Sequence, residues 1–417
     1  MTSSIAWFPD AGRSSPVRPF AGRRVLLGVT GGLASYKSAW LARLLTQCGA
    51  EVDVVLTRSA QEFVGSITFE ALTGRPVHTQ LIEAGHALDH IRLARAAHAV
   101  VVAPATADFL ARAAAGRADD LLSAILLATP APVLLVPAMN DRMWAHPQTV
   151  QNVQHLRALS YHVLDPDAGD LAVGEGSGPG RMPEPETILA HVGRLLEPSS
   201  PLTGRRVVVS AGPTREALDP VRFLSNRSSG RMGVALAASA WRRGARVTLV
   251  HGPLSVQVPA DMQDVRVETT AEMRDAVATH LPSADVLIMA AAPADFRPAT
   301  VAEAKIKKGS DLDSVSLSRT PDILVETKGL RREGSVAVGF ALETHDLMSN
   351  AKEKLERKAL DIVVANSASE PGAGFESETN RVTLIGRDGG VEEFPLLTKH
   401  EVADAILDRV AEMLRGR

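Results

Sequence analysis

The side chains best suited to chemistry lie in a polar segment between a strand pattern and a helix pattern. The segment from Ser210 to Gly233 is rich in Arg, Asn, Ser and Gly, follows an apolar run at 205–209 and precedes an Ala-rich helical run at 232–241. Such a loop directs polar groups at the N-terminus of the following helix, where backbone N–H groups favour anions. We therefore expect it to bind a phosphate or an acyl phosphate. A surface loop without function is the alternative, although loops of this length in compact domains tend to be functional.

A second Gly-rich turn, near the start of the chain, indicates a second phosphate site. Gly31, Gly32 and Ser35 follow the strand pattern at 23–29, and Thr57 ends the next one. These residues could hold a single phosphate on the helix dipole, as in a mononucleotide such as FMN. A turn serving only close helix packing is the alternative. An NAD dehydrogenase is a weaker reading, because Thr57 and, in the second half, His251 stand where an acidic residue would bind the adenosine ribose.

The two Gly-rich segments each begin a strand–helix–strand unit. The first unit runs through a helix at 36–48 to a strand at 51–57, and the second through a helix ending at 243 to a strand at 246–250. Alternating strands and helices predict α/β domains with parallel sheets covered on both faces. The Pro- and Ser-containing stretch 195–203 is the best linker. We expect two Rossmann-like, doubly wound domains, a flavodoxin-like one at 23–194 and a second at 204–417, with 1–22 as a flexible extension.

Composition excludes several classes of protein. The 417 residues are 45% hydrophobic and 22% charged, with a net charge of -3. The chain therefore lacks the basic excess of nucleic-acid-binding proteins, and no apolar run is long enough to span a bilayer. With Cys48 as its one cysteine, an intramolecular disulfide framework is impossible, so we expect a cytoplasmic location.

Motifs in the first half resemble the FMN-dependent cysteine decarboxylases, specifically phosphopantothenoylcysteine decarboxylase. They are Thr30-Gly-Gly-Leu-Ala-Ser-Tyr-Lys37, Ala103-Pro-Ala-Thr-Ala-Asp108, Pro137-Ala-Met-Asn-Asp-Arg-Met-Trp144 and Gly174-Glu-Gly-Ser-Gly-Pro-Gly-Arg-Met182. The resemblance implies an oxidative decarboxylation with His90 as base and Asn140 holding the substrate carboxylate. It also implies that Pro104 and Thr106 contact FMN and that Arg181 contacts substrate. Without the resemblance, His90 reads as an ordinary histidine near a helix start and Asn140 as a turn residue.

One position departs from that family. Members that complete the reduction carry a cysteine in the flap before the Gly-x-Gly-Arg-Met motif, where this chain has Val173. Valine has no titratable proton, so we expect decarboxylation while the reductive half is in question. Glu175 is a conceivable substitute acid, and a solvated surface carboxylate is the alternative. A regulatory or inactive flavin-binding first domain remains a second reading.

Motifs from Gly204 onward resemble phosphopantothenate-cysteine ligase, which bacteria commonly fuse behind the decarboxylase. The matching segments are Ala290-Ala-Ala-Pro-Ala-Asp-Phe-Arg297, Lys305-Ile-Lys-Lys308, Thr320-Pro-Asp-Ile-Leu324 and Gly339-Phe-Ala-Leu-Glu-Thr344. The resemblance implies ligation of 4'-phosphopantothenate with L-cysteine through an acyl-cytidylate made from CTP, with Mg²⁺ and lysines dispersing the triphosphate charge. Asn226 would act on the acyl-cytidylate and Arg222 on the substrate phosphate or carboxylate. Contacts to CTP are assigned to Ala291, Asp295, Lys305, Pro321, Asp322, Ile323, Leu324, Phe340, Lys354 and Lys358.

The lysines also have a simpler interpretation. Lys305 to Lys308 could be a solvated charge run, and Lys354 and Lys358 stand four residues apart on a helix expected at 348–360, whose face could be exposed. Asp295 follows an apolar strand expected at 286–292, and Phe340 is likewise expected after a strand, where it could stack on the base; the carboxyl ends of parallel strands are where α/β ligands bind. The resemblance further implies a homo-oligomer, a dodecamer.

Overall fold

The computed structural model describes residues 18–82, 88–171, 174, 176–197, 200–256, 258, 261–306, 314–343, 347–367, 377 and 379–416. It divides into two compact units between Glu197 and Pro198. We call the described residues up to 197 the N-terminal unit and those from 200 onward the C-terminal unit. Among them, no helix is both long enough and apolar enough to cross a membrane.

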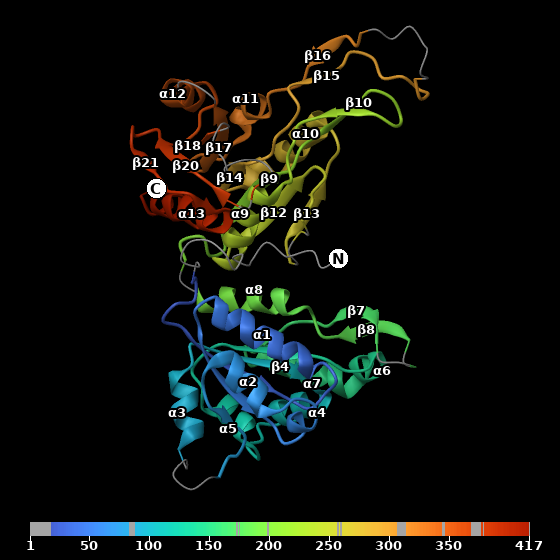
Figure 1. Ribbon diagram of the computed structural model, residues 1–417, viewed down its shortest axis with the longest axis vertical. Coiled ribbons are helices and arrows are strands. Elements are labelled where there is room, and N and C mark those ends of the chain that lie inside the picture. Colours follow the sequence, from blue (N-terminus) through green and yellow to red (C-terminus); the bar gives the residue numbers. More distant parts are fainter. Residues whose placement is uncertain are drawn as a thin grey trace. The chain divides into compact units, whose positions relative to one another are not determined.

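The N-terminal unit is a parallel six-stranded sheet with helices on both faces (Figure 1). Its strands, in spatial order, are β3 (Val77–His78), β2 (Glu51–Leu56), β1 (Arg24–Val29), β4 (Ala99–Ala105), β5 (Val133–Pro137) and β6 (His162–Val163). All seven residues of β4 are buried, as expected for a central parallel strand. The order confirms the Rossmann-like prediction, and it is the 3-2-1-4-5-6 order rather than the 2-1-3-4-5 order of flavodoxin-like sheets.

Eight helices and one hairpin complete the described part of this unit. The helices are α1 (Ser35–Gln47), α2 (Ser66–Thr73), α3 (Asp89–Ala96), α4 (Ala107–Ala114), α5 (Leu121–Ala128), α6 (Asp141–Ala145), α7 (Pro147–Ala158) and α8 (Pro185–Leu196), with a 3-10 turn η1 at Ala60–Glu62. The hairpin pairs β7 (Asp167–Asp170) with β8 (Ser177–Arg181). Several helix starts are fixed locally, since Thr106 caps α4 and Asp120 forms a capping box on α5.

The C-terminal unit repeats the same strand order and extends it. Its sheet runs β13 (Gln263–Arg266), β12 (Arg246–His251), β9 (Arg206–Ala211), β14 (Val286–Met289), β17 (Val336–Glu343), β18 (Ile362–Ser367), β20 (Val382–Gly386) and β21 (Val391–Glu393). The strands from β13 to β18 are parallel, whereas β20 and β21 add antiparallel pairs at one edge. The second doubly wound domain is thereby confirmed.

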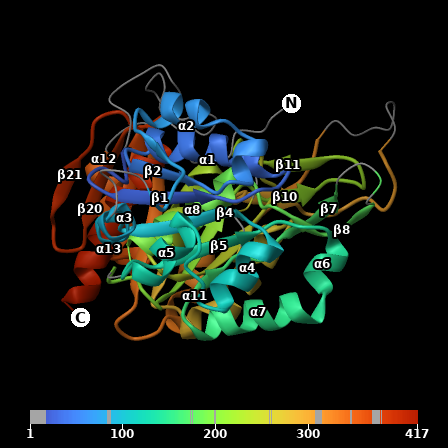
Figure 2. The same ribbon diagram turned by 90° about the horizontal axis from the view of Figure 1, so that it is seen from below.

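Helices pack around this second sheet, and some of its short two-stranded pairs extend away from it (Figures 1 and 2). The helices are α9 (Arg231–Arg242), α10 (Thr270–His280), α11 (Ile323–Thr327), α12 (Leu347–Arg357) and α13 (Lys399–Arg415), with 3-10 turns η2 (Leu281–Ser283) and η3 (Lys328–Leu330). The two-stranded pairs are β10 (Arg215–Ala217) with β11 (Phe223–Ser225), β15 (Phe296–Pro298) with β16 (Leu317–Arg319), and β19 (Thr379–Asn380) with β22 (Leu397–Thr398).

Two segments expected to be extension and linker are partly packed. Phe20 is 1% exposed and donates its N–H to the Cys48 carbonyl, so residues 18–22 belong to the N-terminal unit, while 1–17 lie outside the described residues. In the linker stretch, Leu196 ends α8 and Leu202 is fully buried. The apolar side chains among these polar stretches explain the difference, because burying them is favourable.

Candidate functional sites

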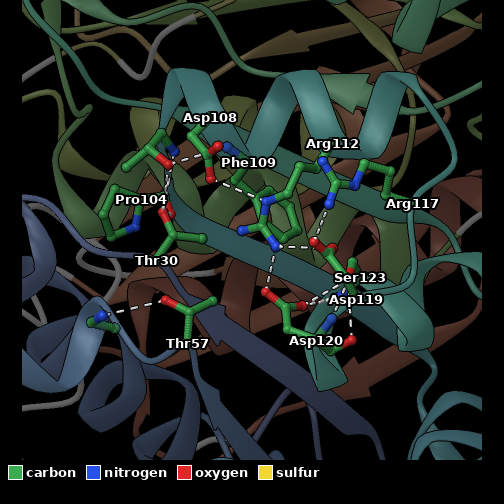
Figure 3. A network of polar contacts seen from close by, with 12 residues as sticks. Thr30, Thr57, Pro104, Asp108, Phe109, Arg112, Arg117, Asp119, Asp120 and Ser123 are labelled. Atoms are coloured by element: carbon green, nitrogen blue, oxygen red, sulfur yellow. Dashed lines mark hydrogen bonds and ion pairs between the residues drawn. The ribbon is translucent and has the colours of Figure 1, made fainter. Parts of the chain in front are cut away.

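The first candidate site lies where the strand order of the N-terminal sheet reverses, between β1 and β4. Thr30, which follows β1, donates its hydroxyl hydrogen to the Pro104 carbonyl at 2.8 Å and accepts from the Thr106 N–H at 3.1 Å (Figure 3). Ligands of open α/β sheets bind at the carboxyl ends of the strands at such a switch point. The structure therefore brings the Thr30–Ser35 turn and the Pro104–Thr106 segment together.

The four residues expected to hold the flavin phosphate divide into two kinds. A Cβ built on Gly32 would meet Thr106 Cγ2 at 3.7 Å as its nearest atom, an ordinary contact, so the backbone there has room for a side chain. A Cβ on Gly31 would instead lie 2.3 Å from Ser59 Cβ, so this glycine allows the close approach of the next loop. Ser35 is buried and donates to the Thr30 and Gly32 carbonyls, and Thr57 accepts from the Ala60 N–H. Gly31, Ser35 and Thr57 thus shape the turn, whereas Gly32 has no close contact that requires a glycine.

A network of charged side chains supports α4, whose N-terminus faces this turn. Arg112 contacts Asp108 at 3.0 Å and, from the next loop, Asp119 at 3.4 Å and Asp120 at 2.6 Å (Figure 3). Burial by itself would raise the pKa of Asp120. Its hydrogen bonds with Arg112 and Ser123 outweigh burial, so the pKa lies below its usual value. The network ties α4 to the start of α5 and so steadies the Thr106 end of the crevice.

His90 and Asn140 lie on different sides of the N-terminal unit. His90 is in the first turn of α3, whereas Asn140 caps α6, and these two helices lie at opposite sides of the unit in both views (Figures 1 and 2). In the described part of the chain, His90 Nδ1 is buried and makes no hydrogen bond. Within one chain, then, the two residues do not meet.

Asn140 lies beside the base of the β7–β8 hairpin. The Met139 N–H donates to the Gly180 carbonyl at 3.0 Å, and a Cβ on Gly180 would lie 2.1 Å from the Met139 carbonyl oxygen. Asn140 Oδ1 accepts from the Arg142 N–H at 3.0 Å, which leaves its amide nitrogen as the donor that a carboxylate requires. Arg181 at the end of the hairpin pairs with Glu184 at 2.7 Å. Val173 and Glu175 lie outside the described residues.

The second candidate site is at the matching switch point of the C-terminal sheet, between β9 and β14. The Ala291 N–H donates to Ser210 Oγ at 3.1 Å, and Asn226 Nδ2 donates to the Pro293 carbonyl at 2.9 Å. The exposed Asp295 follows two residues later. The strand expected at 286–292 ends earlier, at Met289, because Ala291 and Ala292 turn to bond the β9 loop.

The loop that precedes α9 depends on close backbone contacts. Gly230, the N-cap of α9, has φ +76°, and a Cβ on it would lie 2.1 Å from Leu254 Cδ2. A Cβ on Gly233 would lie 2.5 Å from Ala211 Cβ, so this glycine permits α9 to pack tightly on β9. The α9 N-terminus therefore stands against the β9 end, as anion binding at a helix start requires.

Residues 210–233, which we call the opening loop, contain two acidic residues that were given no role from the sequence. Both are buried. Glu216 Oε1 accepts from both the Thr270 N–H and hydroxyl at 2.8 Å, and Thr270 in turn contacts Thr214. Asp219 pairs with Arg222 at 2.6 Å, and this guanidinium holds the pKa of the Asp219 carboxyl well below its usual range. Their only sequence signal was an acid within an otherwise basic loop. Arg222, expected to contact substrate, is thus already engaged through Nε and Nη2.

The remaining nucleotide-binding candidates lie around β17 and α11. Asp322 caps α11, just after Pro321, and its Oδ2 lies 3.1 Å from Lys358 Nζ. Lys358 follows the end of α12, although its N–H still donates to the Lys354 carbonyl. Ile323 and Leu324 are buried in the core. The expectation that Phe340 follows a strand is wrong, because β17 continues to Glu343 by pairing with β18.

The other expected charges are either exposed or outside the described residues. Lys305 is exposed, whereas Lys307 and Lys308 are not described. Among the described residues, no group of three or more His, Cys, Asp or Glu side chains is arranged to hold a metal ion.

Comparisons with known proteins assign a family to each part of the chain. Residues 202–414 match the family model of the DNA/pantothenate metabolism flavoprotein C-terminal domain, and residues 13–197 match the Flavoprotein model. The chain is 44% identical over 402 residues to the coenzyme A biosynthesis bifunctional protein CoaBC of Vibrio cholerae, covering 95% of this chain and 100% of that protein. It is 46% identical over 412 residues to the CoaBC protein of Mycolicibacterium smegmatis, covering 95% and 99%.

Among solved structures, the C-terminal domain of a CoaBC protein is 40% identical and covers 52% of this chain and 100% of that one, with a TM-score of 0.45. A mutant PPC decarboxylase complexed with pantothenoylaminoethenethiol is 32% identical and covers 42% and 99%, with a TM-score of 0.38. The resemblance predicted from the sequence motifs is confirmed by the full-length relatives. The chain belongs to the family of bifunctional coenzyme A biosynthesis proteins, in which a flavoprotein domain precedes a DNA/pantothenate metabolism flavoprotein C-terminal domain.

Proposed function

We propose that this protein ligates 4'-phosphopantothenate with L-cysteine at the expense of CTP and then decarboxylates the product with FMN. The observation that carries the ligase half is the convergence at the β9–β14 switch point. There the Asn226 side-chain amide donates to the Pro293 carbonyl, and the exposed Asp295 lies two residues after Pro293. This places an amide, a carboxylate and a helix N-terminus around one crevice, as a nucleotide and an acyl group require.

In the ligase half, a carboxylate must first acquire a leaving group. Attack of the 4'-phosphopantothenate carboxylate on the α-phosphate of CTP releases pyrophosphate and gives an acyl-cytidylate, which the cysteine amine then opens. Lys305 and Lys358, with Mg²⁺ brought by the nucleotide, disperse charge that accumulates on the phosphates. Asn226 orients the acyl-cytidylate, and Asp322 fixes the Lys358 ammonium, 3.1 Å away.

In the decarboxylase half, the β1–β4 crevice suits a mononucleotide. Two features support the binding of FMN and its substrate here: the room for a side chain at Gly32, and the His90 Nδ1, which makes no hydrogen bond in the described part of the chain. FMN supplies an electron acceptor for oxidation of the substrate thiol. His90 takes a proton from the substrate, and the Asn140 amide donates to the substrate carboxylate. Because α3, which carries His90, and α6, which Asn140 caps, lie on opposite sides of the unit, we infer that one complete site takes its His90 and its Asn140 from different copies of the chain.

The ligase proposal is tested by pyrophosphate release from the full-length protein supplied with 4'-phosphopantothenate, L-cysteine, CTP and Mg²⁺. Lys305→Ala should lower the rate by roughly 10²-fold, since it removes one preorganised electrostatic contact. Lys328→Ala, an exposed lysine on η3, serves as the matched control. Release that needs another nucleotide, or a normal rate in Lys305→Ala, would refute the corresponding assignment.

The decarboxylase proposal is tested by flavin content and carbon dioxide release. The purified protein should be yellow and release FMN rather than FAD on denaturation. His90→Asn should keep the flavin and lose carbon dioxide release. A protein that binds FMN but forms no carbon dioxide would support the second candidate function, a ligase with a regulatory or inactive flavin domain.

Location and assembly stay predictions. We expect a cytoplasmic protein, consistent with its one cysteine, Cys48, being buried. We expect a homo-oligomer, a dodecamer, which light scattering coupled to size exclusion would measure. A monomer in that measurement would contradict the inference that His90 and Asn140 of different copies share a site.

A further inference from the structure

The backbone of Ile306, the residue after Lys305, is held at both of its polar groups. Its N–H donates to Asp219 Oδ2 at 3.2 Å, and its carbonyl accepts from Arg222 Nη2 at 3.0 Å. Both partners come from the opening loop, more than eighty residues earlier. A third bond, from the Ala302 N–H to the Leu218 carbonyl at 3.1 Å, fastens the same segment a few residues upstream.

Asp219 is built to serve as a fixed anchor. Its side chain is fully buried. Oδ1 accepts from the N–H groups of Val221 and Arg222, each at 2.8 Å, and Oδ2 accepts from Arg222 Nε and Nη2 at 2.9 and 2.6 Å. A buried carboxylate satisfied by this many donors has one position, because any displacement leaves buried groups unpaired.

Lys305 combines an exposed side chain with this anchored backbone. Lys305 is exposed. In the chain it lies between Ala302 and Ile306, and both of these residues bond the opening loop through their backbone N–H groups. A lysine on an untethered loop must be ordered when a phosphate binds, whereas a lysine on a tethered loop is already placed. Electrostatic stabilisation depends on that prior placement, and an error of about 1 Å can cost roughly 10²-fold in rate.

We propose that Asp219 is a positioning residue for the ligase reaction, acting through the Ile306 N–H and through Arg222 to place Lys305 against the nucleotide phosphates. The role of Lys305 in this statement rests on the proposed function. In this proposal Arg222 acts by donating a hydrogen bond to the Ile306 carbonyl. Replacing Arg222 should therefore impair the use of CTP even if other residues bind the phosphate of 4'-phosphopantothenate.

The first experiment measures the tether itself, without substrate. Hydrogen–deuterium exchange of the full-length protein is followed over residues 300–306 in wild type, Asp219→Asn and Arg222→Lys. Asp275→Asn is the matched control, because that carboxylate is exposed and, among the described residues, pairs with Arg274 in a surface contact of 2.8 Å. We expect faster exchange at 300–306 in the first two variants and wild-type exchange in the control. The Ala299 N–H, which bonds the Ser316 carbonyl, should stay protected throughout. Unchanged exchange at 300–306 would overturn the proposal.

The second experiment asks whether Asp219 acts through Lys305. Asp219→Asn should lower kcat/KM for CTP by up to roughly 10²-fold, yet add nothing on a Lys305→Ala background, as expected for residues that act as one unit. The same loss on both backgrounds would overturn the proposal. If wild type released no pyrophosphate, the proposed function would be refuted. The hydrogen–deuterium exchange result would then test by itself whether Asp219 and Arg222 hold residues 300–306 in place. If Asp219→Asn did not fold, Arg222→Lys would supply both readouts.

Discussion

Replacing Thr30 with valine tests whether one hydroxyl group holds the flavin crevice together. Valine keeps the shape of threonine and removes its hydroxyl. Thr30 is 2% exposed, and this hydroxyl bonds both the Pro104 carbonyl and the Thr106 N–H across the β1–β4 switch point. The substitution therefore leaves two backbone groups without their partner, on the segment where FMN is proposed to bind.

The expected cost follows from the burial of those two groups. The Pro104 carbonyl is buried, so losing its partner costs roughly 1–3 kcal/mol, while the half-buried Thr106 N–H can recover part of its bond from water. We expect a loss of about 2–4 kcal/mol in the free energy of unfolding of the N-terminal unit. FMN should also bind more weakly, because the crevice walls are no longer tied to each other.

Urea unfolding followed by flavin fluorescence, together with an FMN titration, measures both effects. Thr46→Val is the matched control, since the Thr46 hydroxyl bonds, within the part of the chain that the structure describes, the Ala42 carbonyl one turn earlier in α1. A Thr30→Val protein with the stability and flavin affinity of Thr46→Val would refute the reasoning, because it would mean that the hydroxyl contributes nothing across the crevice.

Three further predictions follow from individual positions. Gly31→Ala should destabilise the fold by about 1–3 kcal/mol through overpacking against Ser59, whereas Gly32→Ala should unfold like wild type and lose FMN affinity; equal behaviour in urea unfolding and FMN titration would contradict this. Burial lowers the pKa of His400 to about 4, so the stability present above the unfolded pKa of about 6.5 should fall by up to about 3 kcal/mol as the pH drops from 6.5 to 4. His400→Gln should flatten that pH dependence in denaturant titrations, and an unchanged slope would count against it. With Val173, the decarboxylation product should be two hydrogens lighter than 4'-phosphopantetheine by mass spectrometry, and Val173→Cys should restore the heavier one; wild type forming 4'-phosphopantetheine at full rate would rule this out.

The sequence predicted the elements and the crevices that they form. Strands are predicted from apolar runs such as 286–289, and tight turns from the glycines at 31–32 and 230–233. Both signals are local, because each is read from residues that are close together in the sequence. Two strand–helix–strand units imply parallel sheets, and the carboxyl ends of parallel strands are where ligands bind. The family motifs added chemical roles for single residues within these crevices.

Only the tertiary structure showed what those residues touch. The Ser35 hydroxyl, which the sequence predicts to bind the phosphate, also donates to two carbonyls of its own turn, and the sequence does not show that contact. Phe340 looked like a residue beyond a strand, yet pairing with β18 extends β17 past it. Each of these outcomes depends on a partner that local sequence cannot specify, whether a neighbouring strand or a turn geometry.

The same limit hid the residues that organise the second site. From the sequence, Asp219 is one acid in a loop, and nothing nearby in the chain indicates that Ile306 will lie against it. The contact spans 87 residues and exists because β9 and β14 are adjacent in the sheet, which places their following loops side by side. The sequence by itself determined which elements form and where ligands should bind. The fold decided which buried carboxylates hold the binding loops, because that depends on contacts between segments that only the packed sheet brings together.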